Sequence, residues 1–170
     1  MTCLFMDLIL YRATHTTLRT RGLLRSWGVA LRNYCPFCSL EEENLPHLFL
    51  RCGTTRPVID AICTLIKNAL NINFNKNMGN IYFKKLIHRI NSVNDKQLVL
   101  FYLVSYLYEV WLHRNVAVFR YRNPPASVIL ASWLKRVTTR RNFDFKLLGQ
   151  SAGNIVYQHW PIYFFDNIIL

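Results

Sequence analysis

The stretch that decides the fold covers residues 34–52 and reads YCPFCSLEEENLPHLFLRC. Its cysteines and its histidine follow the pattern Cys35-x2-Cys38-x8-His47-x4-Cys52. Two cysteines so close in sequence form a tight knuckle that aims both sulfurs at one point, and three thiolates with one imidazole complete a closed tetrahedral Zn2+ site. We therefore predict a structural zinc site, which contributes folding free energy and keeps no open position for catalysis.

Two other interpretations of this stretch remain open. The cysteines and His47 could be ordinary buried side chains, or the first two cysteines could form a redox pair. The redox interpretation needs a βαβ pattern that the surrounding sequence lacks, and it leaves His47 and Cys52 unexplained. The acidic run at 41–43 is expected to be a solvated loop between the two ligand pairs.

The chain holds five cysteines, of which Cys3 and Cys63 lie outside the pattern. An odd count with tight local spacing favours a metal site in a reducing compartment over a disulfide framework. The first residues show neither a basic lead nor a cleavage pattern of a signal peptide. We expect an intracellular protein, nuclear or cytoplasmic, with Cys3 and Cys63 as buried thiols.

Apolar residues at helical spacing predict a mainly α-helical fold, a small helical domain with an embedded CCHC zinc knuckle. The predicted helices cover residues 4–13, 17–27, 54–70, 81–91, 94–119 and 124–139. Gly28 is the expected stop of the second helix, and Pro57 suits the first turn of the third. The expected organisation is a basic helical lead-in (1–34), the zinc knuckle (35–52), a helical body (53–141) with an Asn-rich linker at 71–80, and an apolar tail (142–170).

One segment raises the question of a membrane. Residues 98–112 read LVLFYLVSYLYEVWL and are apolar apart from Glu109 and a serine. A helix that spans a bilayer needs about 20 apolar residues. The segment therefore predicts a core helix that other helices surround, and no membrane span.

The chain is strongly basic, with a net charge of +12 and a pI of about 9.8. Two windows, 13–40 and 110–143, contain no acidic residue and hold many of the arginines. Such a balance favours a nucleic-acid partner, RNA or DNA, with an anionic membrane surface as the rival interpretation.

Three pieces of the sequence resemble the zinc-binding region found C-terminal to the reverse transcriptase of non-LTR (LINE-type) retrotransposons. The first is CPFCSLEEENLPHLFLRC, and the second is the upstream LRTRGLLRSWGVALRNYCPFC. The third, EVWLHRNVAVF at 109–119, is similar to the Trp-x-x-Arg-Asn helix of that family. Together these pieces cover residues 17–120 at intervals.

The resemblance implies that Cys35, Cys38, His47 and Cys52 hold Zn2+ and that the region binds nucleic acid beside a polymerase, which makes DNA by target-primed reverse transcription. The polymerase itself needs clustered aspartates for Mg2+. The aspartates of this chain are scattered: Asp7, Asp60, Asp95, Asp144 and Asp166. We therefore interpret the chain as a fragment without catalysis of its own, with the upstream polymerase region as a further partner.

Two functional hypotheses follow. In the first, arginines bind phosphates with little sequence specificity. The candidate arginines are Arg19, Arg21, Arg25, Arg32, Arg51, Arg56, Arg114, Arg120, Arg122, Arg136, Arg140 and Arg141. Aromatic residues near these charges either stack on unpaired bases or pack in the core; they are Tyr34, Phe37, Phe119 and Tyr121. In the second hypothesis, zinc only fastens a helical scaffold that docks on the polymerase or on a partner protein.

Overall fold

The computed structural model describes residues 4–29, 32–70, 93–140 and 142. In this part of the chain every regular element is a helix, apart from one antiparallel bridge between Tyr34 and Glu42. The predicted mainly α fold is therefore confirmed. The expected linker at 71–80, the expected helix at 81–91, Cys3, Arg141 and the tail from 143 onward lie outside the described residues.

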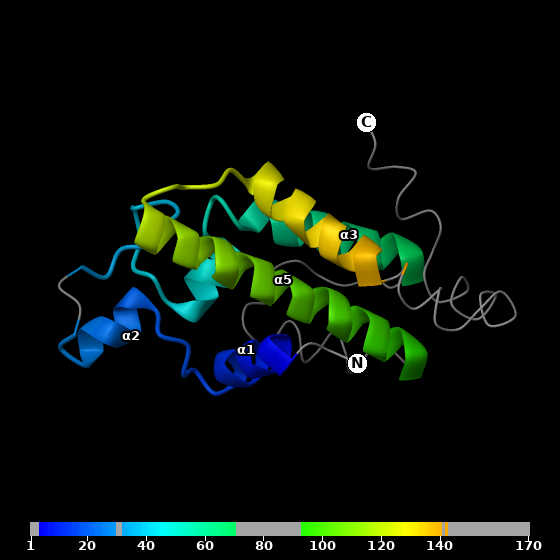
Figure 1. The fold of residues 1–170 in the computed structure, drawn as a ribbon, viewed down its shortest axis with the longest axis horizontal. Helices are drawn as coiled ribbons and strands as arrows, with labels where there is room; N and C mark the ends of the chain where they lie inside the picture. The colour runs from blue at the N-terminus through cyan, green and yellow to red at the C-terminus, as the bar shows by residue number, and fades with distance from the viewer. Residues whose placement is uncertain (1–3, 30–31, 71–92, 141, 143–170) are drawn as a thin grey trace, which may run out of the picture.

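The central element is α5 (Val93–Arg120), which runs along most of the molecule. On one side it packs against α1 (Leu4–Thr14), and on the other against α3 (Arg56–Leu70) and a helix over 126–140 (Figure 1). Its buried side chains include Val99, Tyr102, Leu103, Val104, Tyr106 and Val110. The apolar segment at 98–112 is thus the core helix that was predicted, and none of the described helices is long and apolar enough to cross a membrane.

The flanking helices each bury one face. In α3 apolar residues at helical spacing are buried, with Ile62 and Ile66 almost fully enclosed. In the helix over 126–140 the buried residues Ile129, Trp133 and Val137 recur every fourth position, as one face of an α-helix requires. The indole N–H of Trp133 donates to the carbonyl of Tyr102 at 3.0 Å, which fixes this helix against α5.

The acid that interrupts the apolar segment holds two helices together. Glu109 is buried, and its carboxylate accepts a hydrogen bond from the guanidinium of Arg136 on the helix over 126–140. His113, one turn further along α5, lies 3.9 Å from the same carboxylate and 3.1 Å from the hydroxyl of Ser132. Burial lowers the pKa of His113, against the opposing pull of Glu109.

The second helix, α2 (Arg21–Ser26), is shorter than the predicted 17–27. It begins late because the Thr20 hydroxyl accepts from the N–H of Leu23 at 3.3 Å and so caps the helix. It ends at the predicted place. Gly28 has a φ of +74°, and the N–H groups of Gly28 and Val29 return to carbonyls of the last turn, as in a Schellman motif.

Candidate metal centre and basic surface

The knuckle that carries Cys35 and Cys38 is a tight turn closed by backbone hydrogen bonds. The N–H of Ser39 donates to the carbonyl of Cys35 at 2.8 Å, and the N–H of Cys35 donates to the carbonyl of Glu41 at 2.7 Å. To close the turn, Ser39 takes a φ of +57°, which is unfavourable for any residue but glycine. The turn brings the sulfurs of Cys35 and Cys38 to the same point.

The other two ligands come from a π-helical turn, η1 (His47–Arg51). His47 is its first residue, and Cys52 directly follows its last. On an α-helix, residues five apart would point about 140° away from each other. Here the N–H of Cys52 donates to the carbonyl of His47 at 2.8 Å, a five-residue hydrogen bond that places both side chains on one side. Asn44 prepares this turn, because its side-chain oxygen accepts from the N–H of His47 at 2.9 Å.

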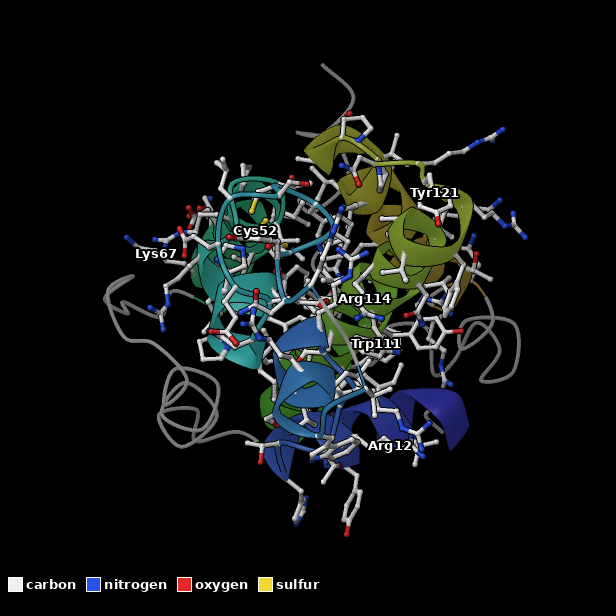
Figure 2. All side chains as sticks on the ribbon, turned by 90° about the vertical axis from the view of Figure 1, so that its left-hand side faces the viewer. Arg12, Cys52, Lys67, Trp111, Arg114 and Tyr121 are labelled. Carbon is white, nitrogen blue, oxygen red and sulfur yellow. The ribbon has the colours of Figure 1, made fainter. Side chains whose placement is uncertain are left out.

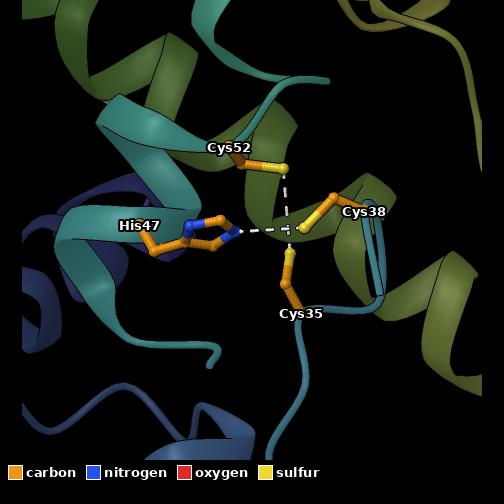
Figure 3. A group of neighbouring side chains, drawn as sticks. All are labelled: Cys35, Cys38, His47 and Cys52. Carbon is orange, nitrogen blue, oxygen red and sulfur yellow. Dashed lines mark hydrogen bonds between the residues drawn. The ribbon is translucent and has the colours of Figure 1, made fainter. Parts of the chain in front are cut away.

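The four side chains converge on one point (Figure 3). Their ligand atoms all lie within 4.8 Å of one another, with 3.8 Å between the sulfurs of Cys35 and Cys52 and 3.4 Å between the Cys38 sulfur and Nε2 of His47. A tetrahedral zinc with ordinary bond lengths sets its sulfurs about 3.8 Å apart and a sulfur and a nitrogen about 3.6 Å apart. The residues present therefore fit Zn2+, and with four protein ligands the site is of the closed, structural type.

The local electrostatics suit a bound cation. The hydrogen bond that the Cys35 thiol donates, together with the N–H groups of Thr54 and Thr55, lowers the pKa of Cys52 to about 5 despite burial. The same hydrogen bond and burial raise the pKa of Cys35. The two sulfurs lie at a distance that a metal ion would span, and binding of the metal would displace thiol protons.

A carboxylate outside the ligand set orients the histidine. Oε2 of Glu41 lies 3.0 Å from Nδ1 of His47, so that Nε2 is the nitrogen that faces the sulfurs. A carboxylate on the far nitrogen of a metal-binding histidine fixes its tautomer and its ring orientation. Glu41 is therefore a positioning residue for His47.

Glu43, two positions further on, is fully buried, so the expectation of a solvated acidic loop is wrong for this residue. Its carboxylate accepts hydrogen bonds from Nε of Arg114 at 2.6 Å and from Nη2 at 2.8 Å, and it also accepts from the N–H of Arg21 at 2.6 Å. A buried carboxylate is tolerated only with such partners. Nothing in the run of three glutamates distinguishes Glu43 from its neighbours, so no local signal predicts this role.

The same contact requires a glycine in α2. The N–H of Gly22 donates to the carbonyl of Glu43 at 3.1 Å. A Cβ at this position would lie 2.8 Å from that carbonyl oxygen, which is too close for any side chain. Gly22 therefore allows α2 to approach the metal-binding segment directly.

Two further hydrogen bonds attach the metal-binding segment to the helical body. The buried hydroxyl of Tyr106 on α5 donates to the carbonyl of Phe49 in η1 at 2.6 Å. The side-chain amide of Asn123, just after α5, donates to the carbonyl of Phe37 in the knuckle at 3.2 Å. The metal centre is thus built into the end of the helical body (Figure 2).

The candidate arginines divide by exposure. The exposed group is Arg19, Arg25, Arg32, Arg51, Arg120 and Arg122. The partly buried group is Arg21, Arg56, Arg136 and Arg140, of which Arg56 pairs with Asp60 and Arg136 pairs with Glu109. Arg114 differs from all of them, because only 4% of it is exposed and its guanidinium is engaged by Glu43. Arg114 therefore does not belong to the solvent-facing basic surface.

The candidate stacking aromatics also divide. Phe37 is buried in the core, as packing alone would require. Tyr34, Phe119 and Tyr121 are exposed. Cys63, by contrast with the clustered cysteines, is a buried thiol on the apolar face of α3, as predicted.

Comparison with known proteins agrees with this geometry. Residues 3–58 match a family model described as zinc-binding in reverse transcriptase. Neither a curated protein nor a solved structure matches the chain. The matched segment contains all four clustered ligands. It ends well before Arg114 on α5, whose guanidinium binds Glu43 inside the segment. Residues 3–58 are thus similar to a zinc-binding domain associated with reverse transcriptases, and Cys35, Cys38, His47 and Cys52 are the residues that could hold its zinc.

Proposed function

We propose that this chain is a zinc-stabilised nucleic-acid-binding module from the C-terminal part of a LINE-type retrotransposon reverse transcriptase, without catalysis of its own. The observation that carries the proposal is that exposed arginines from separate parts of the sequence gather at the end of the molecule that holds the metal centre. The similarity of residues 3–58 to a zinc-binding region of reverse transcriptases supports the same context.

We call this set the arginine end, and define it by Arg19, Arg25, Arg32, Arg120 and Arg122. Figure 1 shows that α2, the knuckle and the end of α5 share one end of the molecule. Two contacts support this placement: the carbonyl of Arg19 accepts from the Arg114 guanidinium at 3.3 Å, and Asn123 binds the knuckle at Phe37. The five guanidinium groups outnumber the exposed acids of the knuckle, Glu41 and Glu42.

Such a surface suits a polyanion. Guanidinium groups bind phosphate oxygens and release condensed counterions, which gives affinity with little dependence on base sequence. All four zinc ligands lie within residues 35–52, and this segment contacts α5 through Glu43 and Phe49, so zinc would keep the arginines of the lead-in and of α5 in one arrangement. The clustered free thiols are consistent with a reducing compartment, the nucleus or the cytoplasm.

A second candidate function is a structural module that docks on the polymerase or on a partner protein. Exposed apolar side chains on the lead-in favour it, since Leu8, Tyr11, Trp27 and Val29 are all open to solvent. In this case zinc would stabilise the scaffold and the arginines would only keep the surface solvated.

The salt dependence of binding separates the two candidates. The zinc-loaded chain is titrated with fluorescent single-stranded RNA and DNA over a series of salt concentrations. For the triple variant Arg19→Gln, Arg25→Gln, Arg32→Gln we expect the slope of log affinity against log salt to fall by about 2, at about 0.7 per phosphate contact. A matched triple removes three exposed charges elsewhere, Arg12→Gln, Lys67→Gln and Lys135→Gln, and should leave the slope nearly unchanged. Absent or salt-independent binding, or an equal loss in both triples, would leave the docking module as the better account.

A further inference from the structure

The segment at the end of α5 alternates aromatic and basic side chains, and all four are exposed. Residues 119–122 read FRYR. Phe119 is 75% exposed and Tyr121 is 93% exposed, and Arg120 and Arg122 are exposed beside them. A large aromatic ring exposed to water lacks the favourable free energy that burial gives to the side chains of the core. Two such rings flanked by cations indicate a surface that meets a ligand.

The backbone conformation of Tyr121 also indicates a ligand-binding surface. Its φ is +52°, in the left-handed region that glycine adopts readily and an aromatic residue rarely does. The position would be more stable as glycine, yet it holds a ring that makes almost no contact with the rest of the described chain. Unfavourable backbone conformations of this kind cluster at ligand-binding sites, where the side chain serves another purpose.

The segment is also fixed relative to the metal centre. The side chain of Asn123, two residues after Tyr121, donates a hydrogen bond to the carbonyl of Phe37. Phe37 is buried, and in the sequence it stands between Cys35 and Cys38. The rings therefore project from an anchored turn that belongs to the arginine end; Figure 2 shows Tyr121 at this end of the molecule, apart from Cys52. An anchored ring loses little conformational freedom when a base stacks on it.

We propose that Phe119 and Tyr121 form a stacking platform for unpaired bases, and that Arg120 and Arg122 hold the sugar-phosphate backbone of the same strand. This proposal rests on the proposed function and narrows its ligand to single-stranded RNA or DNA. In a duplex, the faces of the bases are already stacked and lie out of reach of a ring on a protein surface. Aromatic rings beside basic side chains are the combination that single strands require.

The test compares single-stranded and double-stranded ligands on ring variants of the full zinc-loaded chain. The probe is a fluorescent oligouridine of about 16 nucleotides, the upper end of the usual site size, with a duplex of equal length as reference. Tyr121→Gly removes the ring and relieves the unfavourable φ, so the fold is not endangered. We expect it to weaken single-strand binding about tenfold, with an unchanged salt slope and unchanged duplex binding. Tyr121→Phe keeps the ring and should bind within about twofold of the unaltered chain.

The outcomes distinguish this proposal from the function on which it rests. If the unaltered chain binds no nucleic acid even at low salt, both are overturned. If binding is salt-dependent but Tyr121→Gly and Phe119→Ala bind as tightly as the unaltered chain, only the platform is overturned. Equal affinity for duplex overturns it as well. Loss of a dimer in Tyr121→Gly on size-exclusion chromatography, without loss of binding, would assign the rings to a second copy of the chain instead.

Discussion

Arg114 binds Glu43 through two hydrogen bonds of 2.6 and 2.8 Å, although the two residues are 71 positions apart in the sequence. The pair is almost fully buried, and it joins α5 to the loop between the two ligand pairs. Arg114 also lies over the ring of Trp111, 4.7 Å from its centre, and donates to the side chain of Asn115 at 3.0 Å. The Trp-x-x-Arg-Asn pattern of α5 is thus the support on which the metal-binding loop rests.

Removing one partner of this pair should be strongly destabilising. Arg114→Ala leaves the carboxylate of Glu43 buried without its cation, and we expect the free energy of unfolding to fall by about 3–5 kcal/mol. Arg114→Lys should be nearly as harmful, because an ammonium group cannot make both hydrogen bonds. Denaturant unfolding of the zinc-loaded chain measures both changes.

The matched control for that experiment is Arg56→Ala. Arg56 pairs with Asp60 at 2.9 Å, but both side chains are partly exposed. An ion pair of this kind contributes less than about 1 kcal/mol. A loss at Arg114 no larger than the loss at Arg56 would contradict the supporting role of the buried pair.

The carboxylate of Glu41 should tune the affinity for zinc without determining the fold. Glu41→Ala removes the group that orients His47, and we expect zinc affinity to fall about tenfold, as is usual for such outer partners of a histidine ligand. Competition with a chromophoric chelator measures the change. Glu42→Ala, at the exposed neighbouring position, should leave the affinity unaltered. An identical effect of the two substitutions would show that Glu41 acts only through its charge.

Ser39 should be a position where glycine improves the protein. Its φ of +57° disfavours any residue with a Cβ, and the cost of the left-handed region is about 1 kcal/mol. Ser39→Gly should therefore stabilise the chain, by less than that amount because glycine also favours the unfolded state. Ser39→Val, with a branched side chain, should destabilise it. The unfolding midpoints of the two variants give the order, and a more stable valine variant would show that the turn is not held in this conformation.

His113 gives a prediction about pH. Burial lowers its pKa in the folded state below the ordinary value of 6.5, so the unfolded chain binds this proton more readily. The contribution of neutral His113 to the free energy of unfolding is therefore fully present above about pH 6.5. It is lost as the pH falls below that value toward the lowered pKa. His113→Gln should lose less stability between about pH 7.5 and 5.5 than the unaltered chain. A fall in the His113→Gln variant as large as that of the unaltered chain would contradict the assignment.

Local patterns predicted most of what is local in this structure. The spacing of Cys35, Cys38, His47 and Cys52 predicted the cluster, because each ligand pair is brought together by its own short turn. The stripe of apolar residues on α3 and the all-round apolar character of α5 predicted their burial, since helical periodicity maps sequence onto faces. The stop at Gly28 followed from the need for a left-handed residue after a helix.

Long-range contacts were beyond such patterns. The burial of Glu43 depends on Arg114 at a distant point of the chain, and the burial of Glu109 depends on Arg136. In the sequence each of these acids and arginines looks like a solvent-exposed charge, because nothing local indicates its partner. The π-helical turn at His47–Arg51 was equally hidden, since it follows from the geometry that brings His47 and Cys52 together.

The most direct test of the central claim is the zinc content of the purified chain, measured by elemental analysis. The account predicts about one Zn2+ per chain, because four protein ligands close one tetrahedral site. Cys38→Ser and His47→Ala should release the metal and raise hydrogen exchange over residues 32–56, while the helix over 126–140 stays protected. Cys63→Ala, at a buried thiol outside the cluster, should keep its zinc. Full zinc content in both ligand variants would contradict the account.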